Sequence, residues 1–459
     1  MKKLADILKS KGVGPLGSKS LCKDDLLNLS DLMVSNEESI ITRATLLTAF
    51  LLLENTVEEA NWLKELSRKE DLPEPLWQLL PSSFKKLTSD KKMTFGLSMH
   101  HKILQTKELN PQEVKKLVKF WLNKTSDTTV IASTLEGLRL KRETFGENLE
   151  IWSSLLNKST SHNTQVSEIV DIADIYNGQN RFPLLSPALA CLLASADMHV
   201  SLHGTFEAPP KFGVSVNKIL QAAEIEPCIS LKNSAKCLET VGFSYTDQSV
   251  SFPELYALLN TRIEMVKRPC LATFEKLLSP LKAKNSQELI CGYTHKGYKD
   301  LLPHLAQKMA DSQVEKSEKN NSVRPGQITS FVNLKGLEGS PMTPGNRATN
   351  FARYMNQGEF QGMSDGVFQV EQFEIDPFQI ELDKERTPGE HLAMNIKAMR
   401  EPDSIESQQL HYYATVVMSA LDPQVHPAAI ARTLKSLIIH GEAYAKWQEF
   451  RAFHQQLKG

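Results

Sequence analysis

The sequence predicts an α/β fold in which a small all-helical N-terminal domain, with its helical unit duplicated, precedes a larger α/β domain with a mostly parallel sheet. Three observations support this prediction. The first 157 residues have helical patterns throughout, an 88-residue offset relates two stretches inside them, and short apolar runs alternate with helical stretches from about Val166 onward. We therefore expect helical copies at 1–75 and 76–165 and an α/β domain at 166–459.

The internal repeat pairs Leu21–Leu26 (LCKDDL) with Leu109–Val114 (LNPQEV), each opening an amphipathic helix. The same offset pairs Ala44 with Ala132 and Leu47 with Leu135 without a gap. Thr56 and Thr144, each with Glu three residues on, match a capping box, and Asn110-Pro111 is a typical helix start. Any two amphipathic helical pairs share some likeness, but we favour a true duplication, in which 21–66 and 109–154 superpose.

In the α/β domain, strands are predicted at Ile169–Ala173, Val200–Leu202, Leu289–Gly292 and Phe331–Leu334, and helices at Pro187–Ala196 and Val214–Ala223. Residues 311–326 (DSQVEKSEKNNSVRPG) are polar and unpatterned and end in Arg-Pro-Gly, which predicts a surface loop. The C-terminal tail is predicted to be helical, with long amphipathic pieces at Leu410–Ala420 and Ala428–Phe453.

Composition and charge exclude several classes of protein. Lys and Arg number 53 against 54 Asp and Glu, so no overall basic field argues for nucleic acid. The six cysteines include no C-x-x-C pair, which indicates reduced thiols in the cytosol. No apolar run approaches the roughly 20 residues of a membrane span, and charges interrupt what would be a signal core at Met1–Asp6. We expect a cytoplasmic protein that does not bind membranes.

Charge is nevertheless uneven along the chain. Residues 262–299 hold eight Lys or Arg against three acidic residues, a local balance of +5, whereas residues 365–390 hold eight acidic residues against two basic ones, a balance of −6. Such runs are usually solvated surface. The basic stretch also contains predicted helix starts and turns, so a phosphate site there is the alternative.

Residues 171–204 are the segment most suited to chemistry. A predicted strand leads into the loop Tyr176–Arg181 (YNGQNR), then a helix, then a strand that ends at His203-Gly204. A glycine-containing loop before a helix offers backbone amides and a helix dipole to an anion. The alternative is a plain connection whose asparagines only cap the helix. A lone histidine such as His203 is more often structural than a ligand.

Six stretches together carry a resemblance: KGVGPLGSKSL at Lys11–Leu21, YNG at 176–178 followed by LSPALA at 185–190, VSLHG at Val200–Gly204, KRPCLATFEKLLSP at 267–280, GYTH at 292–295 and KGLEGS at Lys335–Ser340. On these motifs the chain resembles the anthranilate phosphoribosyltransferase family, and within it the divergent branch labelled anthranilate phosphoribosyltransferase-like or glycosyl transferase family proteins. The resemblance covers about 11–66 and 166–459, and the second helical copy is an addition.

The resemblance implies a helical domain joined to an α/β domain, and phosphoribosyl pyrophosphate or another phosphorylated compound as the ligand. It also implies Mg²⁺ without an organic cofactor, and a homodimer; it leaves the catalytic residues unassigned. The residues it assigns are Asn177, Gly178, Asn180, His203 and Gly204 for phosphate and ribose, Arg262 and Arg268 for the acceptor side, and Glu338 for the metal.

The chain departs from the family at three points. The family's Gly-Thr-Gly-Gly-Asp loop is Tyr-Asn-Gly-Gln-Asn at 176–180, its adjacent acidic pair is reduced to Glu338, and its Asn-Arg after His-Gly is Thr205-Phe206. Fewer glycines and a single carboxylate weaken the diphosphate and Mg²⁺ sites. We expect a phosphoribosyltransferase-like protein inefficient with anthranilate; the alternative is a non-catalytic nucleic-acid-binding or regulatory module on the same fold. In open α/β sheets a ligand binds outside the C-terminal ends of the strands, which is where we expect this site.

Overall fold

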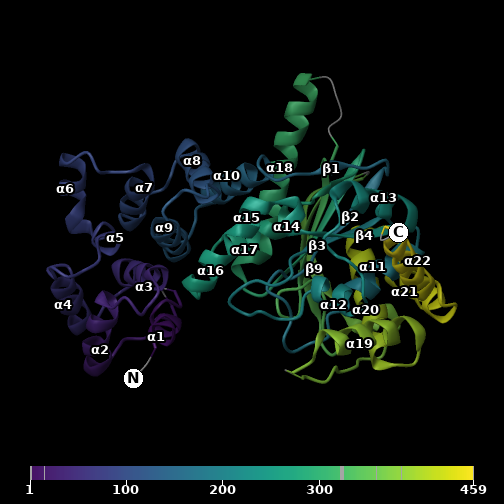
Figure 1. The fold of residues 1–459 in the computed structure, drawn as a ribbon. Coiled ribbons are helices and arrows are strands. Elements are labelled where there is room, and N and C mark those ends of the chain that lie inside the picture. Colours follow the sequence, from purple (N-terminus) through teal and green to yellow (C-terminus); the bar gives the residue numbers. More distant parts are fainter. Residues whose placement is uncertain (1–2, 15, 321–324, 358, 384, 458–459) are drawn as a thin grey trace. The chain divides into compact units, whose positions relative to one another are not determined.

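A computed structural model of the chain describes residues 3–14, 16–320, 325–357, 359–383 and 385–457 (Figure 1). The chain divides into two compact units. The helical unit contains Met1–Asn157 together with Glu254–Phe274, and the sheet unit contains Lys158–Pro253 together with Glu275–Gly459. The segment Glu254–Phe274 therefore belongs with the N-terminal helices, although its position in the sequence led us to expect it in the α/β domain.

The helical unit is built from short and medium helices around an apolar core in which Leu29, Leu47 and Phe50 are fully buried. Its helices are α1 (Leu4–Lys11), α2 (Lys23–Val34), α3 (Ile40–Leu52), α4 (Val57–Leu66), α5 (Glu74–Trp77), η1 (Pro81–Ser83), α6 (Phe84–Ser89), α7 (Phe95–Leu104), α8 (Pro111–Trp121), α9 (Thr128–Lys141), α10 (Phe145–Leu156), α15 (Pro253–Ala257), α16 (Leu259–Met265) and α17 (Leu271–Phe274).

Three pairs of helices in this unit begin 88 residues apart. These pairs are α2 with α8, α3 with α9 and α4 with α10. Thr56 and Thr144 both form complete capping boxes, at the starts of α4 and α10, as the sequence predicted. The register of helix starts and caps thus repeats through the unit. Superposition of 21–66 on 109–154 stays a prediction.

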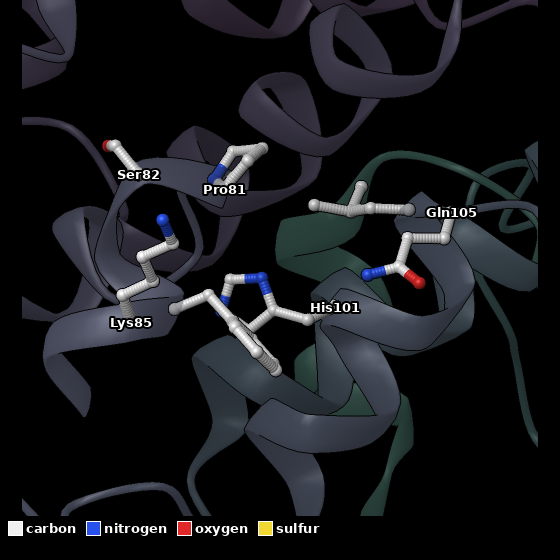
Figure 2. Close-up of a pocket in the computed structure, with 7 residues that line it drawn as sticks. Pro81, Ser82, Lys85, His101 and Gln105 are labelled. Carbon is white, nitrogen blue, oxygen red and sulfur yellow. The ribbon is translucent and has the colours of Figure 1, made fainter. Parts of the chain in front are cut away.

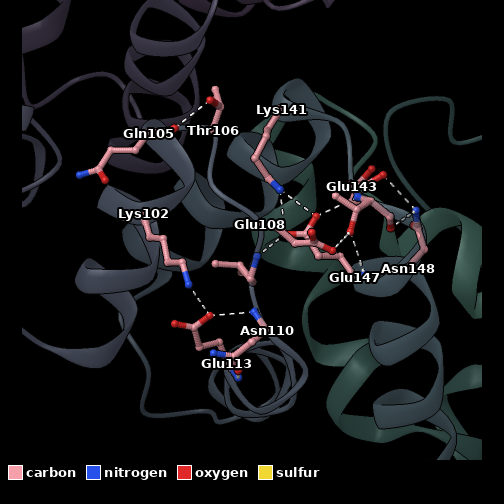
Figure 3. Close-up of polar contacts among 12 residues, drawn as sticks. Lys102, Gln105, Thr106, Glu108, Asn110, Glu113, Lys141, Glu143, Glu147 and Asn148 are labelled. Atoms are coloured by element: carbon pink, nitrogen blue, oxygen red, sulfur yellow. Dashed lines mark hydrogen bonds and ion pairs between the residues drawn. The ribbon is translucent and has the colours of Figure 1, made fainter.

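A buried glutamate repeats with the same partners in each copy. Glu59 accepts the backbone N–H groups of Leu21 (3.0 Å) and Thr56 (2.9 Å), and Glu147 accepts those of Leu109 and Thr144 (2.9 and 2.8 Å). Both glutamates form ion pairs with lysines whose side chains are buried, Lys11 with Glu59 (2.8 Å) and Lys141 with Glu147 (2.7 Å), and Figure 3 shows the second pair. The Glu59 carboxylate therefore joins the start of α4 to the segment before α2, and the Glu147 carboxylate joins the start of α10 to the segment before α8.

The sheet unit contains a seven-stranded sheet in the order β4-β3-β2-β6-β7-β8-β9. The first five strands in that order run parallel, and β8 and β9 are antiparallel additions at one edge. The strands are β2 (Glu168–Ala173), β3 (Val200–Gly204), β4 (Phe243–Asp247), β6 (Ser286–Tyr293), β7 (Ile328–Lys335), β8 (Thr349–Gln357) and β9 (Phe360–Phe368), with β1 (His162–Asn163) and β5 (Leu281–Lys282) forming a separate pair. The predicted mostly parallel α/β sheet is confirmed.

One face of this sheet holds the large apolar core. Side chains alternate between faces along a strand, so Val170, Ile172 and Leu202 point to the same side and meet the fully buried helix α11. Figure 1 shows α11, α20, α21 and α22 gathered on one side of the sheet. The helices of the unit are α11 (Ser186–Ser195), α12 (Val216–Ala222), α13 (Leu231–Val241), α14 (Gln248–Ser251), η2 (Glu275–Leu277), α18 (Gly297–Asn320), η3 (Val370–Phe373), α19 (Pro388–Arg400), α20 (Ile405–Leu421), α21 (Pro427–Ile439) and α22 (Glu442–Gln456).

Two local predictions are wrong. The loop expected at 311–326 is helical as far as Asn320, because α18 continues through it; residues 321–324 lie outside the described residues. The single tail helix expected at Ala428–Phe453 is two helices, α21 and α22, because the chain turns at Gly441, whose φ of +76° is left-handed.

All six cysteines are free thiols, four of them buried and Cys22 and Cys228 exposed. Over the part of the chain that the structure describes, the helices are too short or too polar to cross a bilayer. The basic stretch 262–299 is divided at Phe274 between the two units, so its local charge of +5 does not belong to either unit alone.

We predict that Glu59→Ala and Glu147→Ala destabilise the protein by similar amounts, about 3 to 5 kcal/mol each. Each substitution leaves a buried lysine without its counter-ion and removes the acceptor of two backbone N–H groups. Urea unfolding of the two variants measures this loss. Exposed Glu58 on α4 is the control, because its replacement by Ala removes no buried partner. A loss confined to one of the two glutamates would contradict the proposed equivalence of the copies.

Candidate functional site

The candidate site lies in the sheet unit, where the parallel strands end. The loop that follows β2 runs from Asp174 to Leu185 and leads into α11, and a second loop follows β7 from Gly336. Both loops leave the C-terminal edge of the same sheet, because β2 and β7 both pair with β6 in parallel. The loop predicted to bind phosphate and the residue predicted to bind metal are therefore brought together.

Glu338 joins these loops through three successive backbone amides. Its Oε1 accepts the N–H groups of Asn180 (3.2 Å), Arg181 (2.7 Å) and Phe182 (3.2 Å), and its Oε2 is also within reach of the Asn180 amide at 3.3 Å. Lys211, from the chain between β3 and α12, forms an ion pair with Oε2. Successive amides that converge on one point, with a cation beside them, are an anion-binding arrangement. We call Asn180, Arg181, Phe182 and Lys211 the anion nest.

The charge of Glu338 is stabilised inside this nest. Its side chain is only 4% exposed. Burial alone would raise the pKa of the Glu338 carboxyl, but the Lys211 ammonium and the amides of Arg181 and Asn180 outweigh it and hold that pKa below its usual range. The nest therefore holds a full negative charge at neutral pH, and that charge belongs to the protein itself.

Gly178 has a structural reason for being glycine. Its φ is +73°, and a Cβ there would lie 2.3 Å from the carbonyl carbon of Gly213. The segments around Gly178 and Gly213 are held at this close approach by reciprocal backbone hydrogen bonds of 2.9 Å between Gln179 and Val214. The Gly213 amide also donates to the Asn177 carbonyl. Gly178 thus permits the approach of residues 213–214, where the sequence had suggested the approach of a phosphate.

The start of α11, predicted as a phosphate cradle, is bonded by side chains of α19. The Leu184 amide donates to Nδ1 of His391 (2.9 Å), and the Ala188 amide donates to Oδ1 of Asn395 (3.0 Å). Burial and the nearby Arg386 guanidinium lower the pKa of His391 to about 4, so its ring is neutral and Nδ1 accepts at pH 7. The backbone N–H groups at the start of α11 therefore donate to uncharged side chains of α19.

His203 lies at the end of β3 and is fully buried. Its Nδ1 is 2.8 Å from Oη of Tyr176, and its Nε2 is 2.8 Å from Oδ1 of Asp171. Gly204 follows against Asp174, since a Cβ at Gly204 would lie 3.1 Å from the Asp174 Cβ. Both ring nitrogens of His203 are occupied, so contact with a ligand requires one of these two bonds to break.

Three buried polar groups that have no hydrogen-bond partner in the described part of the chain lie near the same edge. The Nδ2 atom of Asn177 and the Oγ1 atoms of Thr205 and Thr246 are buried and have no hydrogen-bond partner among the described residues. They follow or end β2, β3 and β4, three neighbouring parallel strands. Buried polar groups are nearly always satisfied in proteins, by protein, water or ligand. Asn177 was predicted as a ligand residue, and Thr205 was noted only as a departure from the family. Thr246 gave no signal, because isolated threonines in strands are common.

The acceptor-side residues predicted from the resemblance belong to the other unit. Arg262 lies buried on α16, and Arg268 is exposed in the segment before α17. The structure does not group either arginine with the nest within one unit, so their role on the acceptor side stays a prediction.

The residues at the strand ends do not fit the Mg²⁺ implied by the resemblance. Both oxygens of Glu338 are taken by the nest, and Asp174 accepts the amides of Ile175 and Val216 (2.8 Å each). Asp247 accepts from Asn217 (2.7 Å). Among the described residues, no three His, Cys, Asp or Glu side chains are grouped as metal ligands.

The helical unit has a surface pocket of about 390 Å³ between α6 and α7. Figure 2 shows the His101 ring between Lys85 and Gln105, with Pro81 and Ser82 nearby. The ring Nε2 of His101 is 3.1 Å from the Gln78 carbonyl, and burial lowers the pKa of this histidine. The pocket is mostly apolar and lacks the converging donors of the nest, so the nest is the stronger candidate.

Comparison with known proteins bears on the fold. No family model matches the chain. An uncharacterised protein of Aquifex aeolicus is 24% identical over 262 residues, which are 57% of this chain and 69% of that protein. Among solved structures, anthranilate phosphoribosyltransferase from Thermus thermophilus is 16% identical with a TM-score of 0.58, covering 77% of this chain and 98% of that one.

The Saccharomyces cerevisiae anthranilate phosphoribosyltransferase in complex with PRPP and Mg is 11% identical with a TM-score of 0.57, covering 83% of this chain and 99% of that one. Nearly the whole of each enzyme is matched, whereas about a fifth of this chain is not. At these identities the comparison shows the fold alone. The chain has the fold of the anthranilate phosphoribosyltransferases.

Asp174 gives the site a titration near neutral pH. Burial raises the pKa of its carboxyl from 3.8 to about 7, against the opposing effect of the Val216 and Ile175 amides and of His203. The folded state therefore binds a proton that the unfolded state releases above pH 4. Since this raised pKa favours the folded state at low pH, we predict that the stability contributed by Asp174 falls as pH rises from about 4 to about 7.

Asp174→Asn removes this titration. The difference in unfolding free energy, wild type minus variant, is expected to decrease by up to about 1.4 kcal/mol per pH unit in that window and to be flat above it. Urea unfolding at a series of pH values measures it, with Asp376→Asn at an exposed position as the control. A difference that grows with pH would mean that the Val216 and Ile175 amides dominate and hold the pKa low.

Proposed function

We propose that this protein binds a phosphorylated ribose, of the phosphoribosyl pyrophosphate type, at the C-terminal edge of its parallel sheet. The observation that carries the proposal is the anion nest: the amides of Asn180, Arg181 and Phe182 and the ammonium of Lys211 converge on one carboxylate. A phosphoryl group is an anion with the same acceptor geometry and more charge. Such donors bind phosphate in many unrelated proteins.

The ribose part of the proposal rests on the groups beside the nest. Asn177, Thr205 and Thr246 offer buried amide and hydroxyl groups without partners among the described residues, and these are the groups that recognise sugar hydroxyls. Asn177 and Thr205 follow β2 and β3, and Thr246 is the last residue but one of β4, at the edge where open α/β sheets bind nucleotides and sugar phosphates. The fold shared with anthranilate phosphoribosyltransferases supports the same ligand class.

Efficient transfer to anthranilate is not part of this proposal. The glycine-poor loop is closed against Gly213, and the carboxylate expected to hold Mg²⁺ is paired with Lys211. The residues present can bind and orient a phosphorylated sugar. Where the resemblance places a second acidic residue next to Glu338 the chain has Gly339, so the metal charge that a leaving diphosphate needs is not provided for at that position.

We predict that phosphoribosyl pyrophosphate and ribose 5-phosphate bind the protein and that ribose does not. Lys211→Met should weaken this binding about tenfold or more, because a charge-assisted hydrogen bond contributes about 1.5 to 3 kcal/mol. Isothermal titration calorimetry without added metal measures the dissociation constants. Lys446→Met removes a surface ion pair with Glu449 on α22 and serves as the control. If the folded Lys211→Met variant bound phosphoribosyl pyrophosphate with the wild-type dissociation constant, the phosphate site would have to lie elsewhere than the nest.

We also predict that turnover of anthranilate with phosphoribosyl pyrophosphate and Mg²⁺ stays far below the roughly 10 s⁻¹ typical of enzymes. Loss of anthranilate fluorescence follows the reaction, and the Thermus thermophilus enzyme provides the positive control in the same assay. Turnover at an ordinary enzymatic rate would show that the altered loop and the single carboxylate suffice for catalysis.

A further inference from the structure

The anion nest is already filled by a side chain of the same protein. Every donor of the nest reaches the Glu338 carboxylate: three backbone N–H groups at 2.7 to 3.3 Å and the Lys211 ammonium. A phosphoryl oxygen needs the same donors, and one set of converging amides cannot bind two anions at once. Occupation by Glu338 and by a ligand therefore exclude each other.

The backbone at Glu338 is unusual for its residue type. Its φ is +55°, in the left-handed region that disfavours residues with a Cβ, and Gly339 follows at +95°. The neighbouring turn is secured without the Glu338 side chain, by hydrogen bonds from the Ser340 amide to the Leu337 carbonyl (3.0 Å) and from the Leu337 amide to the Met342 carbonyl (2.7 Å). The side chain of Glu338 can thus leave the nest while the main chain of its loop remains bonded.

The remaining elements around the nest are also held independently of Glu338. Residues 178–179 and 213–214 pair through backbone bonds, the Lys211 ammonium donates to the Gly178 carbonyl at 2.8 Å, and His391 binds the Leu184 amide. An empty nest therefore keeps its donors in place. This is the condition for exchange of one anion for another without unfolding.

We propose that Glu338 is a built-in competitor for the anion nest, so that a phosphoryl group binds only after the Glu338 carboxylate has been displaced and Lys211 has passed to the ligand. This inference rests on the proposed function for the identity of the ligand. It adds that the apparent affinity of the wild-type protein for a phosphoryl ligand equals the affinity of the open nest multiplied by the fraction of molecules in which Glu338 has left it. A ligand with two or more charges is favoured, because it must replace a carboxylate that is already ionised.

The test compares pyrophosphate binding to wild type and to Glu338→Gly by isothermal titration calorimetry, without metal, near pH 7.5. Glycine removes the carboxylate and suits the left-handed backbone at this position. We expect the variant to bind about tenfold or more tightly, which corresponds to an open nest in about a tenth of wild-type molecules or fewer. Glu374→Gly is the matched control, since Glu374 also has a φ of +56° and an ion pair, with exposed Arg432 at 2.8 Å.

Acetate distinguishes a vacated nest from a generally loosened protein. In Glu338→Gly, acetate should compete with pyrophosphate, because it restores the missing carboxylate; in wild type it should have no effect at the same concentration. Glu338→Gln provides a second variant that retains the side-chain volume and loses the charge. It should also bind pyrophosphate more tightly than wild type if the glycine variant does not fold.

The outcomes separate this inference from the proposed function. If wild type binds phosphoribosyl pyrophosphate and the Glu338 variants bind no more tightly than wild type, the competitor role is overturned and the proposed function stands. If only the variants bind phosphoryl compounds, the competitor role is supported and ligand binding by the wild-type protein is overturned. If folded wild type and variants all fail to bind pyrophosphate and phosphoribosyl pyrophosphate, both proposals fall.

Discussion

The hydrogen bonds that gather on the Glu338 carboxylate organise the functional edge of the sheet unit. They connect the loop after β7 to the loop after β2 and to the chain that carries Lys211, two segments that the bridge between Gln179 and Val214 also pairs with each other. A buried carboxylate is stabilised only when its oxygens receive hydrogen bonds and its charge is paired. The nest meets both conditions. The Glu338 carboxylate is therefore the point at which the loop after β2, the chain around Lys211 and the loop after β7 meet.

The two faces of the sheet differ in the polarity of the side chains that they carry on β2, β3 and β4. Val170, Ile172 and Leu202 face the helices, and their apolar surfaces form the core that fixes the strands. The alternate positions on β2, β3 and β4 carry polar groups, namely Asp171, Ser201, His203, Ser244 and Thr246, all of them buried. The same face also carries buried apolar side chains, such as Ile169 on β2 and Phe331 on β7. The three strands that carry the polar groups named above end at the candidate site.

Features determined by neighbouring residues could be predicted from the sequence. The capping boxes at Thr56 and Thr144 need only a residue three positions on, and the four predicted strands need only their apolar runs. The β8–β9 hairpin was missed because neither strand has a continuous apolar run: β8 reads TNFARYMNQ, and in β9 only Phe368 is buried. The extension of α18 was missed because residues 311–320 are charged and show no apolar periodicity.

The residues of the candidate site could be predicted in part from the sequence, whereas the hydrogen bonds and ion pairs among them could not. The loop at Tyr176–Arg181 and Glu338 were both expected at the C-terminal edge of the sheet, the loop as a phosphate contact and Glu338 as a metal ligand. Nothing in the sequence indicates that Lys211 lies beside Glu338. Nor does it indicate that His391 binds the amide of Leu184, a residue more than 200 positions earlier in the chain. Contacts of this range depend on the tertiary fold. The same distance explains why Gly178 was interpreted as a phosphate contact and not as the partner of Gly213.

Glu59, Glu147 and Glu338 use one chemical device, a buried carboxylate that collects backbone amides and a lysine, with two different consequences. Glu59 and Glu147 accept the N–H groups at the start of their own helices, so releasing them exposes a helix end to unfolding. Glu338 accepts amides from a different loop, and the main chains on both sides have other hydrogen bonds. Under the proposed competitor role, release of Glu338 leaves these donors in place and open to another anion.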